Sequence, residues 1–142
     1  MVRGKYIGAA AMIALARQRK AADASVGPRL NFIEGQLPDA PIPEMAYTAI
    51  ISNSLLHHLH RPELLWRAIS DLGEPGAPVL VMDLLRPESV TRAREIVDSY
   101  AGDEAPVLKE DFYNSLLAAF EPAEVARQLD EAGLVTLKID LV

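Results

Sequence analysis

The sequence contains no cysteine among its 142 residues. This absence excludes a disulfide framework, a thiolate nucleophile and a cysteine-based metal site. It also fits a reducing compartment, and we expect a cytoplasmic protein. A chain of this length can bury one core but not two, so we expect a single domain over residues 1–142.

Positive charge and long apolar runs are also scarce. Lys and Arg number 14 against 20 Asp and Glu, which gives a net charge of -6. Phosphates would be repelled over most of such a surface, so we expect no nucleic-acid partner. No apolar run approaches the roughly 20 residues that a membrane-spanning helix needs, so we expect no membrane partner. The apolar stretch from residue 6 to 16 is followed by a basic cluster, where a signal peptide would have its cleavage site.

Short apolar and β-branched runs are present and predict strands. The four runs are Arg29–Glu34, Ala46–Ser52, Ala77–Leu84 and Val135–Leu141. The middle two are nearly continuous in apolar residues, which is typical of strands covered by helices on both faces. The segment Lys5–Ile7 is expected to be the end of a further strand.

Helical patterns alternate with these runs. They cover Ala9–Ala24, Pro62 to Gly73, Pro87 to Tyr100, Leu108–Phe120, and Pro122 to Gly133. Proline suits the first turn of a helix, and glycine suits its end. The alternation predicts an α/β fold, a Rossmann-like three-layer αβα sandwich with a mainly parallel sheet. The carboxyl ends of parallel strands meet at one edge, where open α/β sheets bind their ligands.

The single tryptophan, Trp66, lies within the second of these helical patterns. We expect its ring to pack against the core and its N–H to reach solvent.

Three short motifs follow or precede the predicted strands. They are GQLP at residues 35–38, NSLLHHLHRP at residues 53–62, and GEPG at residues 73–76 leading into a strand that ends near Asp83. In this order and at this spacing they resemble the class I S-adenosylmethionine-dependent methyltransferase family, from about Ala9 to Val142. The resemblance implies transfer of a methyl group from S-adenosylmethionine to a small-molecule acceptor.

The resemblance also implies a site for the adenine of the cofactor. Gln36 stands where the family usually has an aspartate that accepts a hydrogen bond from the adenine amino group, and a glutamine carbonyl can accept it too. Gly35 belongs to the same turn, and Leu37 would pack on the adenine face. Met12 matches an apolar residue of the helix that follows the family's second strand.

The loop after the second predicted strand is implied to face the reaction. Asn53, Ser54 and Leu55 lie where the family's loop passes the methionine half of the cofactor. His57 would face the acceptor, and a histidine titrates near the working pH of a general base. Methyl transfer needs mainly alignment of donor and acceptor, so a base is dispensable. The three histidines crowd one loop without cysteine or HExxH spacing, so no metal site is predicted.

Two further residues have two interpretations each. Asp83 follows a predicted strand and would either reach the substrate or cap the turn before Arg86. Tyr113 would either orient an acceptor or pack beside a helical stripe of apolar side chains. That stripe consists of Phe112, Leu116 and Phe120.

Some family features are missing from the sequence. The first strand with its GxGxG loop should precede Met1, and the acidic residue that binds the ribose hydroxyls should fall at about Ile7 or Gly8. The family's last strand should follow Val142. We therefore expect a domain truncated at both ends, whose exposed sheet edges would allow a homodimer. The alternative is a catalytically inactive methyltransferase-like fragment that acts as a binding or dimerisation module. A hydrolase is not supported, because no GxSxG motif occurs.

Overall fold

The structure is a computed structural model that describes residues 8–22, 25 and 30–142. Internal contacts divide the chain into two compact units, residues 1–44 and residues 45–142. The single domain over the whole chain stays a prediction. The predicted strand end at Lys5–Ile7 lies outside the described residues.

The first unit contains helix α1, Gly8–Ala22, close to the predicted bounds. Alanine-rich sequence favours this helix, since alanine has the highest intrinsic helix propensity. The predicted strand at Arg29–Glu34 is wrong: residues 30–34 pair with no strand in the described part of the chain. A strand exists only through hydrogen bonds to a neighbour, and here the carbonyl of Phe32 accepts instead from Arg17 at 3.3 Å.

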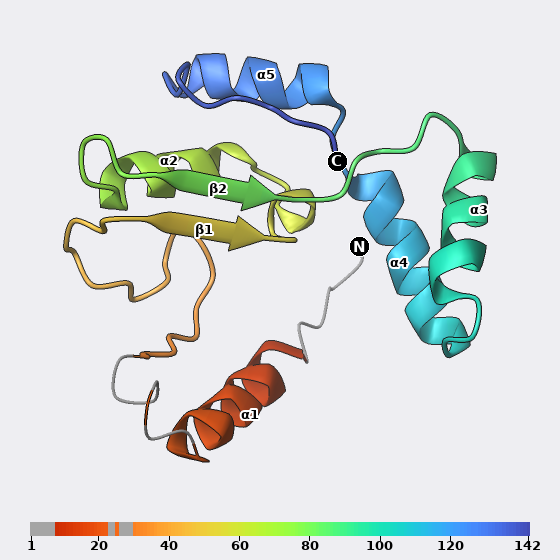
Figure 1. Cartoon of the computed structure of the whole chain (residues 1–142), viewed down its shortest axis with the longest axis horizontal. Helices are drawn as coiled ribbons and strands as arrows, with labels where there is room; N and C mark the ends of the chain where they lie inside the picture. Colours follow the sequence, from red (N-terminus) through yellow and green to blue (C-terminus); the bar gives the residue numbers. More distant parts are fainter. Residues whose placement is uncertain (1–7, 23–24, 26–29) are drawn as a thin grey trace. The chain divides into compact units, whose positions relative to one another are not determined.

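The second unit is built on two parallel strands, β1 (Ile50–Asn53) and β2 (Val79–Met82). They lie in register from Ile50 opposite Val79 to Asn53 opposite Met82. Helix α2, Glu63–Leu72, makes the crossover between them, and Figure 1 shows it against one face of the pair. The two central strand predictions and this helix are confirmed, with shorter strands than expected. The result is a mixed α/β structure that is consistent with part of a Rossmann-like fold.

The two faces of the strand pair differ. The α2 face is covered by side chains that are 2–4% exposed, namely Leu65, Trp66 and Ile69. On the other face Ile51 is 73% exposed, and Leu80 and Met82 are each 50% exposed. That helices cover both faces of these strands stays a prediction. The three-layer sandwich stays a prediction.

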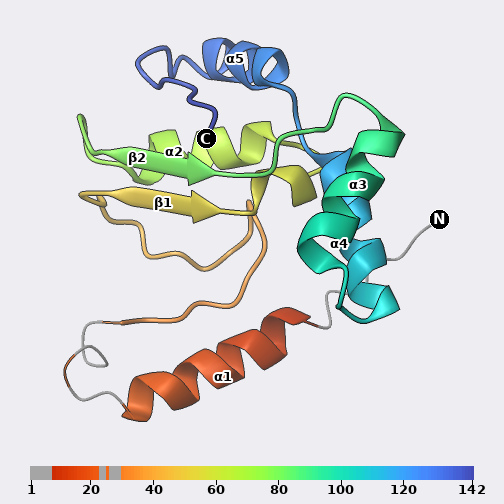
Figure 2. The same cartoon turned by 45° about the vertical axis from the view of Figure 1, so that its right-hand side comes forward.

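Three helices follow the strands: α3 (Val90–Ala101), α4 (Pro106–Ala118) and α5 (Pro122–Glu131). Figures 1 and 2 show α3 and α4 side by side beyond the carboxyl ends of β1 and β2. All three helices were predicted, but α3 begins three residues later than the predicted start at Pro87. The reason is an N-cap: the hydroxyl of Ser89 accepts a hydrogen bond from the backbone N–H of Arg92 at 3.0 Å. Among the described helices, none has both the length and the apolar character to span a membrane.

A small core joins α3 to α4. Its buried members are Ala93, Val97, Ala101 and Leu116. The side chain of Ala93 is 0% exposed, and its small volume lets the two helices approach closely. Leu84, which follows β2, packs against this core. The helix pair is thereby attached to the end of the sheet.

The predicted last strand at Val135–Leu141 is wrong. Residues 137–142 have no strand pairing in the described structure, and residues 132–136 form turns around Gly133, whose φ is +72°. The β pattern of the sequence is present, but no described strand lies beside it to complete a hydrogen-bonded ladder.

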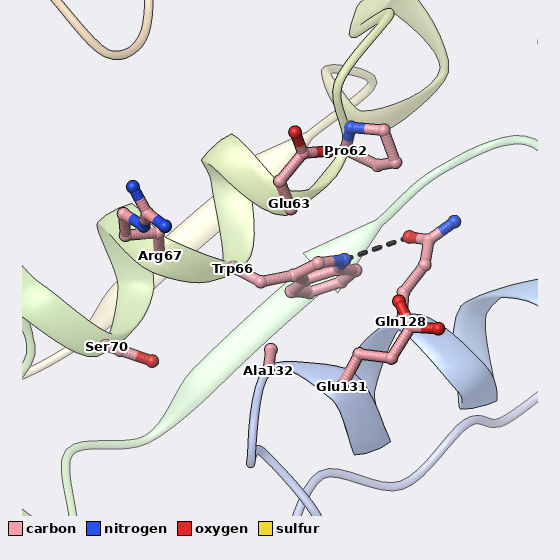
Figure 3. A pocket seen from close by; sticks show the side chains of 8 residues that line it. All are labelled: Pro62, Glu63, Trp66, Arg67, Ser70, Gln128, Glu131 and Ala132. Atoms are coloured by element: carbon pink, nitrogen blue, oxygen red, sulfur yellow. Dashed lines mark hydrogen bonds between the residues drawn. The ribbon is translucent and has the colours of Figure 1, made fainter.

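Helix α5 packs against α2 through Trp66. The indole N–H donates to the Oε1 atom of Gln128 at 2.9 Å, and Figure 3 shows this bond at the edge of a cavity of about 340 Å³. The expectation that this N–H reaches solvent is therefore wrong. The cavity lies between α2 and α5 and is lined by Pro62, Glu63, Trp66, Arg67, Ser70, Gln128, Glu131 and Ala132.

Candidate functional site

The loop that follows β1 turns sharply at the carboxyl end of the strand pair. The N–H of Ser54 still donates to the carbonyl of Met82 at 2.9 Å, which extends the strand pairing by one residue. Ser54 then has a φ of +53°, a conformation that is rare for residues other than glycine. The chain continues into a short 3₁₀ helix, η2, at Leu56–His58. This turn separates the loop from the strand and brings η2 beneath α4, which it contacts.

Asp83, directly after β2, connects this loop to the neighbouring strand. Its Oδ2 atom accepts a hydrogen bond from the N–H of Leu56 at 2.8 Å, and its Oδ1 atom accepts from the N–H of Leu84 at 2.8 Å. The Nδ1 atom of His57 lies 2.5 Å from the same Oδ1 atom. The side chains of His57 and Asp83 are only 3% and 10% exposed, so this pair is shielded from water.

The geometry favours one tautomer of His57. Both carboxylate oxygens of Asp83 already accept from backbone N–H groups, so Nδ1 of His57 is the natural donor in the short contact. The Nε2 atom then carries the free lone pair in the neutral ring. A histidine held in this way is suited to take up a proton at Nε2.

His58 is exposed to solvent, and its ring lies tilted against that of His57. Its ring centroid lies 3.9 Å from that of His57, with an interplanar angle of 43°. Partial burial and the neighbouring His57 lower the pKa of His58 below its ordinary value of 6.5, while Asp83 acts in the opposite direction. The neutral form of His58 is therefore favoured near pH 7.

This lowered pKa predicts a loss of stability in mild acid. Because the folded pKa lies below the unfolded value of 6.5, the stabilisation is complete above 6.5 and is lost as the pH falls through the folded pKa. We expect the free energy of unfolding to fall between pH 7.5 and pH 5 by more in the natural chain than in His58→Gln. Urea titrations at the two pH values measure both changes. An equal loss in the two proteins would contradict the assignment to His58.

The residues predicted to contact the methionine half of the cofactor lie together at this edge. Asn53, Ser54 and Leu55 are exposed at the end of β1 and the start of the loop. Tyr113 lies elsewhere, on α4, where it packs against the α3–α4 core. The guanidinium of Arg94 lies 5.8 Å from the centroid of its ring. The acceptor-binding role of Tyr113 stays a prediction, and its contacts support the packing alternative.

The residues predicted to contact adenine lie in the first unit. Met12 is on α1 and 67% exposed. Gly35, Gln36 and Leu37 enter a turn, in which Gln36 is exposed and Leu37 is partly buried. A Cβ atom on Gly35 would lie 2.7 Å from the Cα of Ala40, so this turn requires glycine. The roles of these four residues stay predictions.

The sequence did not predict the hydrogen bonds of Asp83 to Leu56 and His57, because these residues are 27 and 26 positions away. The signal that could have revealed them is topological. Asp83 follows one strand of a parallel pair, and the loop of residues 54–62, here called the histidine loop, follows the other, so they meet at its carboxyl edge. Among the described residues, no group of three His, Asp or Glu side chains is placed to hold a metal ion.

Residues 8–81 match the methyltransferase domain family. The chain belongs to the class I S-adenosylmethionine-dependent methyltransferase family. In this methyltransferase-family chain the matched range covers α1, β1, the histidine loop and α2, and it ends within β2. Asp83 and helices α3 to α5 lie beyond it. No curated protein and no solved structure matches the chain.

Proposed function

We propose that the chain contributes to the transfer of a methyl group from S-adenosylmethionine to a small-molecule acceptor. The observation that carries this proposal is the family match over residues 8–81, which includes the loop at the carboxyl end of β1. That loop presents an amide, a hydroxyl and an apolar side chain, those of Asn53, Ser54 and Leu55, all exposed. Such a mixed set suits the polar amino-acid end and the aliphatic methylene groups of a methionine moiety, so the residues present fit the cofactor.

We assign the adenine contacts to the first unit. The exposed amide of Gln36 can accept from an adenine amino group, and Leu37 and Met12 supply apolar surface for the ring. The turn that carries Gln36 requires glycine at position 35, because a Cβ atom there would lie 2.7 Å from the Cα of Ala40.

The proposed chemistry assigns a separate task to His57. S-adenosylmethionine supplies an electrophilic methyl group on a sulfonium when it is bound. Asp83 holds the Nδ1 atom of His57, which leaves Nε2 to accept the proton of an acceptor that reaches it. Where the acceptor is already deprotonated, alignment by the loop is sufficient.

The alternative is an inactive methyltransferase-like fragment that acts as a binding or dimerisation module. The exposed apolar face of the strand pair, with Ile51, Leu80 and Met82, favours it. Burial of this face between two copies of the chain would produce a homodimer. Sedimentation velocity at several protein concentrations tests this alternative directly.

Calorimetry with S-adenosylmethionine tests the proposed function. We expect the natural chain to bind the cofactor, and Asn53→Ala to weaken binding about fivefold, which corresponds to one lost hydrogen bond of about 1 kcal/mol. Asn114→Ala makes the same change at an exposed position of α4 and should leave the affinity unchanged. Absence of binding at millimolar cofactor would exclude catalysis by this chain alone and leave the alternative.

A further inference from the structure

We propose that Asp83 is the positioning residue of this site, which fixes both the shape of the histidine loop and the tautomer of His57. Asp83 itself is not available to a substrate. The consequence for activity rests on the proposed function, whereas the consequences for loop shape and tautomer do not.

The first support is the number of donors that one carboxylate receives. Two backbone N–H groups and one imidazole nitrogen lie within 2.8 Å of its two oxygens. The donors come from two separate segments, the loop after β1 and the residue after β2. With its side chain 10% exposed, Asp83 has little surface left for a further ligand. The carboxylate therefore joins two segments of the protein and does not face a substrate.

The second support is the start of η2. The N–H of Leu56 is the first of this 3₁₀ helix and has no acceptor within it, and the preceding residue, Leu55, supplies no side-chain cap. Asp83 supplies the missing acceptor from another strand. The positive φ of Ser54 is a costly conformation that persists only when surrounding contacts hold it. The bond from Leu56 to Asp83 is such a contact, two residues further along the chain.

The third support is a series of side-chain contacts that leads from Asp83 to His57 and on to His58. The carboxylate orients the ring of His57, and that ring lies in tilted contact with the ring of His58, which is exposed. On the other side, α4 contacts η2 and limits its movement. A change at Asp83 should therefore alter the exposed imidazole of His58 through the ring of His57.

Nitrogen NMR of the histidine side chains tests the tautomer in the natural chain without any variant. Long-range ¹H–¹⁵N correlation spectra distinguish a protonated Nδ1 from a protonated Nε2. We expect His57 to show a protonated Nδ1 and an unprotonated Nε2 at pH 7.5. His57→Asn assigns the signals among the three histidines. A natural chain whose His57 carries its neutral-ring proton on Nε2 overturns the proposal.

Asp83→Asn tests the control of loop and tautomer together. An amide has one acceptor oxygen and one NH₂ group, which faces either the N–H of Leu56 or both the N–H of Leu84 and the Nδ1 atom of His57. In the first orientation we expect the amide signal of Leu56 to shift, and in the second we expect the Nδ1–H tautomer of His57 to lose population. Asp71→Asn, the same change at an exposed position of α2, should leave these signals in place. A folded Asp83→Asn variant in which the signals of Leu56 and of His57 both stay unchanged would also overturn the proposal.

A kinetic comparison connects the inference to the proposed function. With an acceptor that must lose a proton, we expect Asp83→Asn to lower kcat by about tenfold, which corresponds to one charge-assisted hydrogen bond, and to change KM less. Asp71→Asn should behave as the natural chain. A natural chain that binds no cofactor refutes the proposed function but leaves the NMR result on Asp83 intact. An unchanged kcat in Asp83→Asn, with cofactor bound normally, refutes the positioning role in catalysis.

Discussion

Replacement of Trp66 by alanine is expected to lower the free energy of unfolding by about 3–5 kcal/mol, the usual cost of removing a large aromatic side chain from a core. The side chain is 2% exposed and lies on α2, the helix that covers the strand pair. It also donates to Gln128 of α5 at 2.9 Å. Its removal leaves a void beneath α2 and deprives Gln128 of its partner. Urea denaturation followed by far-UV circular dichroism measures the loss, since the protein has no other tryptophan to report by fluorescence.

Two variants separate the contributions of packing and hydrogen bonding at Trp66. Trp66→Phe keeps most of the apolar volume and removes the N–H donor, so it should cost about 1–2 kcal/mol. Arg67→Ala alters the next residue of α2, which is exposed, and should change the stability by less than about 0.5 kcal/mol. A loss below 1 kcal/mol in Trp66→Ala would show that this ring does not organise the core of the second unit.

The helices could be predicted because their signals are local. Pro62 and Gly73 flank α2 as the sequence indicated, and Pro122 begins α5. The side chain of Glu124 accepts a hydrogen bond from the backbone N–H of Glu121 at 2.8 Å. The two residues are three positions apart, so this signal for the start of α5 is local. The start of α3 was predicted at Pro87, but the helix begins at Val90 because Ser89 is its N-cap. Proline and serine are both common near the first residue of a helix, so the sequence offered two starting points.

The strands could be predicted only where the sequence also supplies a neighbour. β1 and β2 pair directly with each other and are connected along the chain by one helix, and each prediction overlaps the observed strand. The runs at residues 29–34 and 135–141 also contain apolar and β-branched residues but gain no described partner. Apolar alternation reports what a segment would bury in a strand and not whether a second strand lies beside it. For this reason the same pattern succeeded twice and failed twice.

The candidate site shows the same limit for side chains. The loop after β1 was predicted from its motif, and the structure places Asn53, Ser54 and Leu55 at the carboxyl end of the strand as expected. The contacts of Asp83 with Leu56 and His57, and of Trp66 with Gln128, could not be predicted, because these partners lie 26 or more residues away in the sequence. Contacts of this kind depend on register and crossover geometry, which no local pattern contains.

Asp83→Ala is expected to be the second most costly substitution, with a loss of about 3 kcal/mol in the free energy of unfolding. It leaves the N–H groups of Leu56 and Leu84 without their acceptor, and each buried unsatisfied donor costs about 1–3 kcal/mol. It also leaves the imidazole of His57, which is 3% exposed, without its partner. Asp71→Ala is the matched control on the surface of α2 and should change the stability by less than about 0.5 kcal/mol.

A double-mutant cycle shows how much of this loss belongs to the pair of Asp83 and His57. If the two side chains stabilise each other, Asp83→Ala combined with His57→Ala should cost at least about 1 kcal/mol less than the sum of the single losses. The rest of the loss in Asp83→Ala belongs to the backbone N–H groups of Leu56 and Leu84, which lose their acceptor whether or not His57 is present. Additive losses would mean that the short contact contributes nothing of its own to stability, and that Asp83 acts on the backbone alone. The Oδ1 atom of Asp83 accepts from the N–H of Leu84 and from Nδ1 of His57. The coupling energy therefore measures how much the contact that orients His57 contributes to the stability of this part of the fold.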